Sequence, residues 1–439
     1  MKSAKKLILL FLAALLLSGC ARTVDQMYCL PKRSDTFNDL QTVIDGAMIG
    51  LEYCAPLAGE NRQTVQMADL NGDGYNEYLL FAKSTQEDRP LRILVFQLLE
   101  KAFVLKDIVE CNGTAFDQVE YVDMNGDGGM EIIVGRQLSD QVIRSVSVYS
   151  WVDDVLTQLV TANYTKFLTT DLNQDELGEL FLLRPGNTET DNGVAELYSM
   201  ESGTMERYNE VNMSQPADKL KRIIVGKLEG GQVAVYTAST VGETALVTDA
   251  YTLKDGLLKN VSFSNESGTG VQTMRNFYVY ADDIDNDTVV ELPFLIEMKT
   301  LPEIERLDSN QLIRWYAMTP DGGEVVKMYT YHNFVGGWYM QLNGDWAQRV
   351  SVANYGTYYV FYIWDEEYIS CQKIMTIYAN SRQSHTDQNR KDGEFVLMET
   401  DAIIYSAVLE NDASDYGLQK ENLKNYFCLI QQDWKTGET

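Results

Sequence analysis

The sequence has little of the equipment that common enzyme families use. Among 439 residues there are two histidines, His332 and His385, and neither stands in a pattern that pairs it with a nucleophile. No GxSxG, P-loop or dinucleotide-binding fingerprint occurs. These absences argue against serine hydrolases and nucleotide-dependent enzymes, and they favour a protein that is not an enzyme.

Cysteine is also scarce, with six residues and no CxxC spacing. Five of the six lie far apart along the chain: Cys29, Cys54, Cys111, Cys371 and Cys428. An odd number at wide spacings argues against a zinc site and against a disulfide framework. We expect buried free thiols, with a disulfide between Cys371 and Cys428 as the alternative.

Basic residues are heavily outnumbered. The chain has 36 Lys and Arg against 64 Asp and Glu, a net charge of −28. Nucleic acids and anionic lipid surfaces attract clustered cations, so neither is an expected partner. The acidity suits a protein that uses extracellular Ca²⁺, although for carboxylates outside the loops described below solubility explains it equally well.

Long apolar runs are missing except at the beginning of the chain. There, Lys2, Lys5 and Lys6 precede the apolar run 7–17, which is too short to span a bilayer. The run ends in Leu-Ser-Gly-Cys20, which resembles a bacterial lipobox. This resemblance implies a signal peptide over 1–19, cleavage before Cys20, and a lipid on Cys20 that anchors the protein to the outer face of the cell membrane. An ordinary signal peptide with an incidental cysteine is the alternative.

What the sequence does contain is a nine-residue loop that occurs four times, each time before an apolar run such as Leu79-Leu-Phe81. Oxygen-bearing side chains recur at positions 1, 3, 5 and 9, an arrangement that wraps a hard cation such as Ca²⁺. These side chains belong to Asp69, Asn71, Asp73 and Glu77; Asp123, Asn125, Asp127 and Glu131; Asp171, Asn173, Asp175 and Glu179; and Asp283, Asp285, Asp287 and Glu291.

The spacing of the loops indicates a repeat of about 50 residues. The first aspartates lie 54, 48 and 112 residues apart, and the last gap is twice 56, so one copy has lost its ligands near residue 227. Each loop is preceded by a strand pattern, such as Phe277–Tyr280 for the last copy. Each is followed by an aromatic-bearing strand, a turn and another strand. Four short strands per repeat predict a mainly β fold, a five-bladed β-propeller over 60–333.

Two further segments flank the repeats. Residues 20–59 contain a polar tether and an amphipathic helix over about 36–52, with apolar residues at helical spacing. Residues 334–439 carry strand patterns without loops and end in an amphipathic pattern over 418–434, which predicts a terminal helix. We expect a C-terminal α+β domain there.

The loops resemble the Ca²⁺ loops of integrin-alpha-type FG-GAP (or VCBS) repeats, and this resemblance implies that the sixteen side chains named above bind Ca²⁺. An EF-hand is excluded because position 12 falls inside a β-type run. The chain departs from the family by using Glu at position 9, and by placing Glu176 and Thr288 at position 6, where glycine turns most easily. Polar residues that merely cap a turn are the alternative to metal binding.

The stretch Gly337–Trp346 and the terminal helix pattern resemble the PsbP-like α/β/α sandwich of some bacterial lipoproteins, which implies binding rather than catalysis. Together these patterns predict a lipid-anchored, non-enzymatic surface protein with a protein or glycan ligand. The alternative is an extracellular enzyme that acts on polysaccharide through a carboxylate pair on the propeller face.

Overall fold

The computed structural model describes residues 35–431 except 86, 140–142, 189–190, 277–278, 300–310 and 384–390. The predicted signal peptide, Cys20 with its lipid, Cys29 and His385 lie outside these residues. Within the described part of the chain, no helix combines the length and the apolar content needed to cross a membrane.

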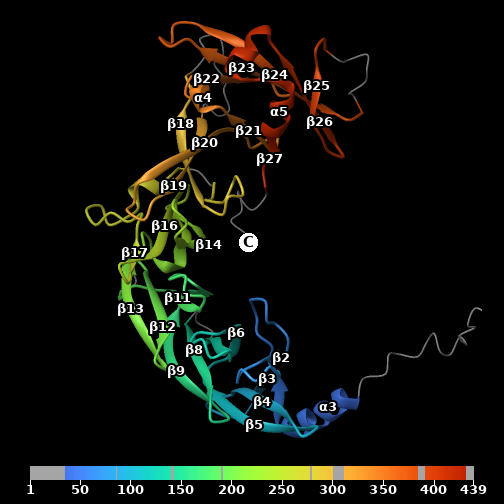
Figure 1. Ribbon diagram of the computed structural model, residues 1–439, viewed down its shortest axis with the longest axis vertical. Helices are drawn as coiled ribbons and strands as arrows, with labels where there is room; N and C mark the ends of the chain where they lie inside the picture. Colours follow the sequence, from blue (N-terminus) through green and yellow to red (C-terminus); the bar gives the residue numbers. More distant parts are fainter. Residues whose placement is uncertain are drawn as a thin grey trace, which may run out of the picture.

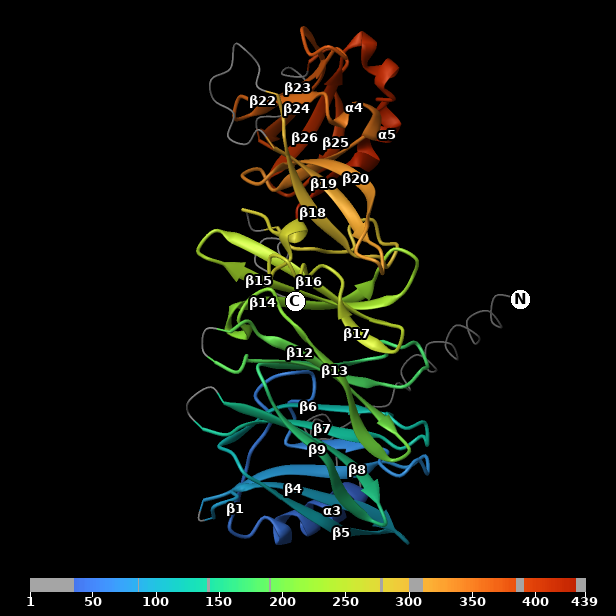
Figure 2. The same cartoon turned by 90° about the vertical axis from the view of Figure 1, so that its left-hand side faces the viewer.

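The described chain is mainly β and forms a succession of antiparallel sheets (Figure 1 and Figure 2). The first sheet contains β1 (Leu51–Tyr53), β2 (Val65–Ala68), β3 (Glu77–Ser84), β4 (Leu91–Leu99) and β5 (Ala102–Cys111). The second contains β6 (Ala115–Val122), β7 (Glu131–Gln137), β8 (Arg144–Val152) and β9 (Val155–Tyr164). The third contains β10 (Lys166–Thr170), β11 (Glu179–Arg184), β12 (Val194–Glu201) and β13 (Thr204–Asn212).

The fourth sheet has its four strands in chain order, and the fifth and sixth sheets have five strands each. The fourth contains β14 (Leu220–Lys227), β15 (Val233–Val241), β16 (Ala245–Lys254) and β17 (Leu257–Asn260). The fifth contains β18 (Glu291–Glu297), β19 (Gln311–Met318), β20 (Glu324–Asn333), β21 (Trp338–Leu342) and β27 (Phe427–Leu429). The sixth contains β22 (Val350–Asn354), β23 (Tyr358–Trp364), β24 (Cys371–Ser381), β26 (Ile403–Leu409) and β25 (Phe395–Glu399).

In the second and third sheets, the strand that follows the loop carries a continuous apolar run because both of its faces are buried. In β7, Ile132 and Val134 pack toward the first sheet, whereas Ile133 between them packs toward the third. In β11, Leu182 faces the second sheet and Phe181 faces the fourth. Successive side chains of a strand point to opposite faces, so an unbroken apolar run predicts a sheet sandwiched between two others.

The predicted turn between the last two strands of each repeat is confirmed in the first four sheets. Pairs of adjacent residues at these turns have positive φ, for example Glu100 (47°) with Lys101 (77°) and Asp255 (54°) with Gly256 (71°). Two left-handed residues in a two-residue loop give the turn whose twist matches that of the strands it joins. The aromatic-bearing strands predicted before these turns are β4, β8, β12, β16 and β19.

The sheets follow one another along an open arc, and the last strands of the first four sheets (β5, β9, β13 and β17) lie toward its convex side (Figure 1). No strand pairing among the described residues joins the first sheet to the fifth or sixth. The predicted sheets are therefore present, but they do not close into a five-bladed ring in this structure.

Helix α3 (Asp35–Ala47) covers the outer face of the first sheet, where Leu40 and Ile44 pack on Leu80 and Leu94. That face is the one a neighbouring blade would cover in a ring.

Both predicted terminal helices are shorter than the patterns indicated. Helix α3 ends at Ala47 rather than 52, because Gly50 adopts a positive φ of 82° and the chain then turns into β1. Near the other end, α5 covers Lys420–Tyr426 rather than 418–434. The chain then leaves the helix to form β27, whose residues pair with β21.

The fifth sheet differs from its predicted form at both edges. Tyr280, in the predicted first strand Phe277–Tyr280, lies in no strand, and Arg275 instead pairs with Leu246 of the fourth sheet. At the other edge β21 and β27 extend the sheet past residue 334, where the second domain was predicted to begin. Beyond it, the sixth sheet is accompanied by short helices such as α4 (Gly344–Ala347) within the described residues.

The cysteines that the structure describes form no disulfide bond, as predicted: Cys54, Cys111, Cys371 and Cys428. Cys111 is buried and the other three are partly buried. The alternative disulfide between Cys371 and Cys428 does not form.

Candidate metal centre

The four loops have closely similar internal hydrogen bonds, which explains why their residue types recur. In the first loop, the Asp69 carboxylate accepts the backbone N–H groups of Gly72 and Gly74 at 2.8 Å each. The Asn71 side chain accepts the N–H of Asp73 at 2.9 Å. The second loop has the same bonds, whereas in the third and fifth loops the position-1 carboxylate accepts the N–H of position 5 in place of that of position 4. The turn is thus held by side chain to backbone bonds.

Position 6 has the same backbone conformation with and without glycine. The φ angles are 84° at Gly74, 86° at Gly128, 72° at Glu176 and 74° at Thr288. The third and fifth loops therefore turn as tightly as the others, and Glu176 and Thr288 adopt a left-handed conformation that costs a non-glycine residue about 1–2 kcal/mol. The absence of glycine at position 6 therefore does not loosen the turn in these two loops.

The glutamate at position 9 closes each loop. Its Oε2 accepts the N–H of position 2 at 2.7–3.0 Å, from Leu70, Met124, Leu172 and Ile284 in turn. All four glutamates are buried, with exposures of 2% or less. A buried carboxylate needs a cation, a proton or further hydrogen bonds.

The loops differ in what faces the other glutamate oxygen, Oε1. In the first loop, Asn71 and Gln97 both donate to it, at 3.3 and 3.2 Å. In the second loop, Asn125 and Ser150 do the same. In the fifth loop, Oε1 of Glu291 has no hydrogen-bond partner among the described residues.

The acidic side chains also gather most closely in the third and fifth loops. Carboxylate oxygens of one triplet in each loop lie within 4.8 Å of one another: Asp171, Asp175 and Glu179, and Asp283, Asp285 and Asp287. No other triplet of His, Cys, Asp or Glu in the described part of the chain meets this criterion. Three carboxylates within such a distance form an oxygen-rich set of the kind that hard divalent cations bind.

The pKa values of the position-9 glutamates also set the third and fifth loops apart from the first two. Burial raises the pKa of Glu179 to about 7 and that of Glu291 to about 8, and the neighbouring loop aspartates add to both shifts. Burial also raises the pKa of Glu77 and Glu131, and there the donated hydrogen bonds oppose the rise. The third and fifth loops thus hold carboxylates that lack enough positive charge, although Lys327 lies 3.6 Å from Asp287.

A ladder of backbone hydrogen bonds joins the first three loops in series, and a further bond of the same kind joins the fourth repeat to the fifth loop. The N–H at position 8 of one loop donates to the carbonyl oxygen at position 1 of the loop before it: Met130 to Asp69 (2.9 Å), Gly178 to Asp123 (3.1 Å) and Val290 to Lys227 (3.0 Å). Lys227, the last residue of β14, therefore occupies position 1 of the predicted degenerate copy, whose loop leads into β15. Sequence reasoning did not foresee the ladder, because no side chain takes part in it.

The ladder is tight enough to predict the effect of one methyl group. A Cβ added at Gly129 would lie 2.7 Å from the carbonyl oxygen of Leu70 in the preceding loop. We expect Gly129→Ala to destabilise the protein by about 1–3 kcal/mol, because the backbone must move to make room for the methyl group. Gly46→Ala, in α3 with no atom within 4 Å, is the control and should stabilise by about 0.5–1 kcal/mol. Urea titration of both variants measures this, and equal effects would contradict it.

A second prediction concerns pH in the presence of EDTA. Because Glu179 and Glu291 have raised pKa values in the folded state, the folded protein binds more protons than the unfolded protein between about pH 4.5 and 8. Stability of the metal-free protein therefore falls as pH rises through this window, by at most about 1.4 kcal/mol per pH unit for each group. Melting curves in EDTA from pH 5 to 8 measure the slope, which Glu291→Gln should reduce.

Comparison with known proteins gives only remote likenesses. No protein-family model and no curated protein matches the chain. An exotype rhamnogalacturonan lyase (YesX) aligns with 74% of this chain and 83% of its own, at 10% identity and a TM-score of 0.30. A Bacillus licheniformis rhamnogalacturonan lyase covers 74% and 72% at 13% identity and 0.28, and Saccharomyces cerevisiae Sqt1 covers 68% and 80% at 10% and 0.30. Likenesses of this strength carry no argument about fold or function.

Proposed function

We propose that the protein is a lipid-anchored, non-enzymatic binding or scaffold protein outside the cell membrane, and that Ca²⁺ in its loops braces its sheets. The observation that carries this proposal is the loop ladder. The first three loops join the first two strands of their repeats and are bonded in series, as at Met130 and Asp69, and the fifth loop bonds to the fourth repeat through Val290. A cation held in one of these loops would therefore also stiffen a junction between repeats.

We further propose that the five repeats are units of propeller-blade type. Strand number, strand order and the hairpin turns support this assignment. The repeats are stacked here as an open scaffold with a long concave side. Such a scaffold offers surface for a partner rather than a central channel.

The third and fifth loops fit a cation best. Asp171, Asp175 and Glu179 would hold it in one, and Asp283, Asp285 and Asp287 in the other, with the partnerless oxygen of Glu291 nearby. Bound Ca²⁺ would supply positive charge that offsets the crowded carboxylates. Ca²⁺ is favoured over Mg²⁺ because it accepts irregular sets of six to eight oxygens, whereas Mg²⁺ requires near-octahedral geometry. In the first two loops the glutamate oxygen is already occupied by hydrogen bonds, so we expect weaker binding there.

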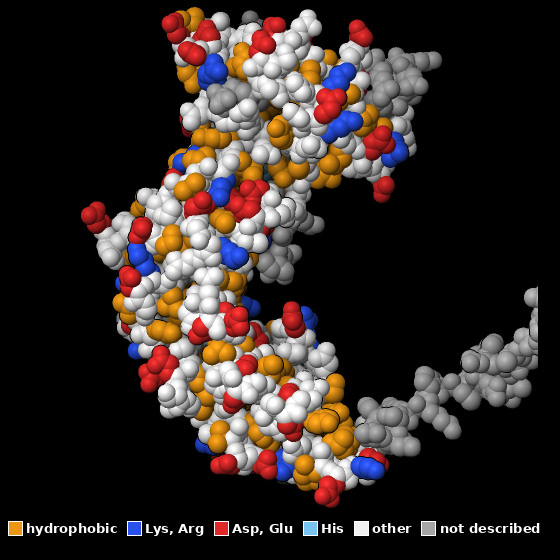
Figure 3. Space-filling model, in the orientation of Figure 1, with side chains coloured by type: hydrophobic (Ala, Val, Ile, Leu, Met, Phe, Trp, Pro, Cys, Tyr) orange, Lys and Arg blue, Asp and Glu red, His pale blue; other side chains and the backbone are white. Residues whose placement is uncertain are grey.

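The surface agrees with a partner that is neither nucleic acid nor anionic lipid. Acidic side chains are spread over the face seen in Figure 3, from the first sheet to the sixth. Membrane attachment would then depend on the lipid at Cys20. Cys20→Ser should abolish incorporation of labelled palmitate, and incorporation that persists in this variant would contradict the anchor.

The binding function is tested by capture experiments on the mature protein. Immobilised protein is incubated with cell-surface fractions and with glycan arrays, in Ca²⁺ and in EDTA. We expect selective capture that is weaker in EDTA, and weaker for Asp285→Asn than for the wild type. The alternative polysaccharide-acting enzyme predicts shortened glycan products in the same samples, and their appearance would overturn the non-enzymatic proposal.

A further inference from the structure

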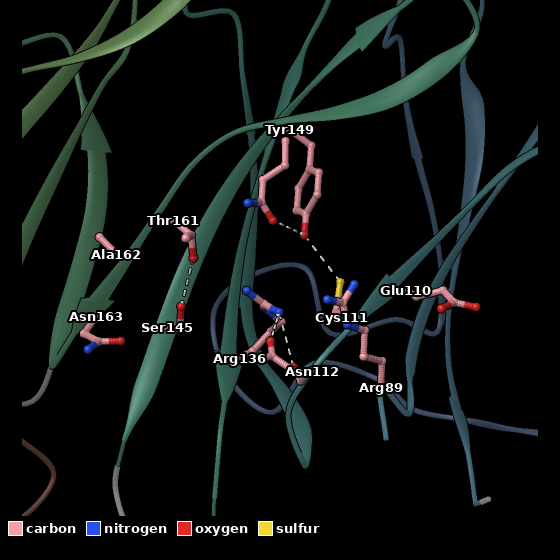
Figure 4. A pocket seen from close by; sticks show the side chains of 11 residues that line it. Arg89, Glu110, Cys111, Asn112, Arg136, Ser145, Tyr149, Thr161, Ala162 and Asn163 are labelled. Carbon is pink, nitrogen blue, oxygen red and sulfur yellow. Dashed lines mark hydrogen bonds between the residues drawn. The ribbon is translucent and has the colours of Figure 1, made fainter. Parts of the chain in front are cut away.

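A polar cavity of about 530 Å³ opens between the first and second sheets, and none of the loop-triplet residues lines it. It is bordered by the end of β5 on one side and by β8 and β9 on the other, with Arg136 of β7 between them (Figure 4). Its lining includes two arginines, one glutamate and several neutral hydrogen-bonding side chains. The contacts between neighbouring sheets are mainly apolar, but polar groups replace them here. Burying polar groups costs folding free energy unless they make hydrogen bonds or bind a ligand.

Arg136 is the most unusual of these groups. Its side chain is buried, with 4% exposure, and no ion pair joins it to a carboxylate among the described residues. Asn112 accepts two hydrogen bonds from Nη1, at its backbone oxygen (3.2 Å) and its side-chain oxygen (2.6 Å), and Ser147 accepts one from Nη2 (2.7 Å). Nε has no partner. The edge formed by Nε and Nη2, which suits a bidentate carboxylate, therefore still has donors to spare.

The second arginine, Arg89, lies on the exposed rim of the same cavity. The one carboxylate in the lining, Glu110, is already paired with Arg92 at 3.3 Å. The charges that line the cavity therefore leave an excess of positive charge, in a protein whose overall charge is strongly negative. An anion that enters is attracted by both arginines.

The remaining polar lining is neutral and suited to hydroxyl groups. Gln158, Thr161 and Asn163 project from β9, and Ser145 from β8. Tyr149 adds an aromatic ring whose hydroxyl donates to Gln158 at 3.4 Å. Amides and hydroxyls both donate and accept, as the hydroxyl groups of a sugar require.

We propose that this cavity binds a sugar acid: its carboxylate pairs with the free edge of Arg136 and with Arg89, and its hydroxyls bond to the side chains of β8 and β9. A carboxylate is favoured over a bare inorganic anion because most of the lining is neutral and extends beyond the two arginines. The inference gives a ligand class to the binding function proposed above and rests on it, but it does not depend on metal in the loops.

The test is isothermal titration of the mature protein with D-glucuronate, D-glucose, acetate and inorganic phosphate. We expect glucuronate to bind with a dissociation constant on the order of 1 mM, as its size allows, and the other three at least about tenfold more weakly. Arg89→Ala should weaken glucuronate binding about tenfold, and Asn163→Ala by a few fold. Thr157→Ala, an exposed residue of β9 outside the lining, is the matched control and should bind as the wild type does. Arg136→Met should abolish binding, and the Arg89 and Asn163 variants decide the matter if it does not fold.

Each other outcome overturns the inference in a definite way. Equal binding of glucose would show that the arginines play no part, and equal binding of acetate or phosphate would show that only charge is recognised. No heat from 10 mM glucuronate would remove the site altogether. None of these results changes the capture experiment with surface fractions, so failure of the cavity and failure of the binding function are distinguishable.

Discussion

EDTA lowers the melting temperature of the mature protein, and an excess of Ca²⁺ restores it. This is the expected result if the third and fifth loops bind Ca²⁺ with the dissociation constants of about 10⁻⁴–10⁻³ M found in extracellular modules. At ten to a hundred times that concentration, each site stabilises the folded state by about 1–3 kcal/mol. Two sites together correspond to a shift of roughly 2–7 °C for a chain of this length that unfolds as one unit. Differential scanning calorimetry in 10 mM Ca²⁺ and in EDTA measures it.

Two variants locate the effect. Asp285→Asn removes one carboxylate of the fifth-loop triplet and should reduce the EDTA-sensitive shift by about half. Asp401→Asn removes an exposed carboxylate outside the loops and should leave the shift unchanged. Melting curves that coincide with and without EDTA in the wild type would contradict metal binding, and the loops would then be turns held by their own hydrogen bonds.

The ladder explains why a local ion should affect the whole chain. Loss of cation from the fifth loop exposes the repulsion among Asp283, Asp285 and Asp287, and this loop bonds through Val290 to Lys227 of the fourth repeat. In a stack of repeats, stability depends on the junctions as well as on the units. We therefore expect the heat of unfolding, and not only the midpoint, to fall in EDTA.

The repeat was predictable from the sequence because it depends on local signals. Loop aspartates, apolar runs and turn residues each act within ten residues of one another, and the gap of 112 residues located the degenerate copy at the place where Lys227 is found. The strands of the C-terminal segment were predicted for the same reason, from alternating or continuous apolar residues such as Tyr358–Trp364.

What could not be predicted depends on contacts between distant parts of the chain. Nothing local in Leu40 or Ile44 says that α3 covers the face of the first sheet, and so nothing in the sequence shows that the arc stays open. The sequence also did not show which of the four loops are best suited to hold a cation. Whether Oε1 of a position-9 glutamate is satisfied depends on Gln97 and Ser150, which come from other strands of the sheet.

A buried ion-pair cluster in the third sheet gives the other large expected effect. Glu196 of β12 is 2% exposed, and its carboxylate accepts hydrogen bonds from Arg184 (2.8 Å), Arg207 (2.7 Å) and Tyr198 (2.8 Å). We expect Glu196→Gln to destabilise the protein by about 3 kcal/mol, because it keeps the volume but leaves Arg184 partly buried with less compensating charge. Glu210→Gln, at a half-exposed partner of the same arginines, is the control and should cost less than about 1 kcal/mol.

The pH dependence separates this charge effect from a packing effect. Burial alone would raise the pKa of Glu196, but the hydrogen bonds from Arg184, Tyr198 and Arg207 outweigh it and hold the pKa below its usual value. A carboxyl whose pKa is lower in the folded state stabilises the protein above its unfolded pKa of about 4.5, and this contribution is lost as pH falls. Urea titrations of the wild type and Glu196→Gln should therefore differ at pH 7 and converge toward pH 3. A difference that stays constant over this range would show that the glutamine disturbs packing rather than charge.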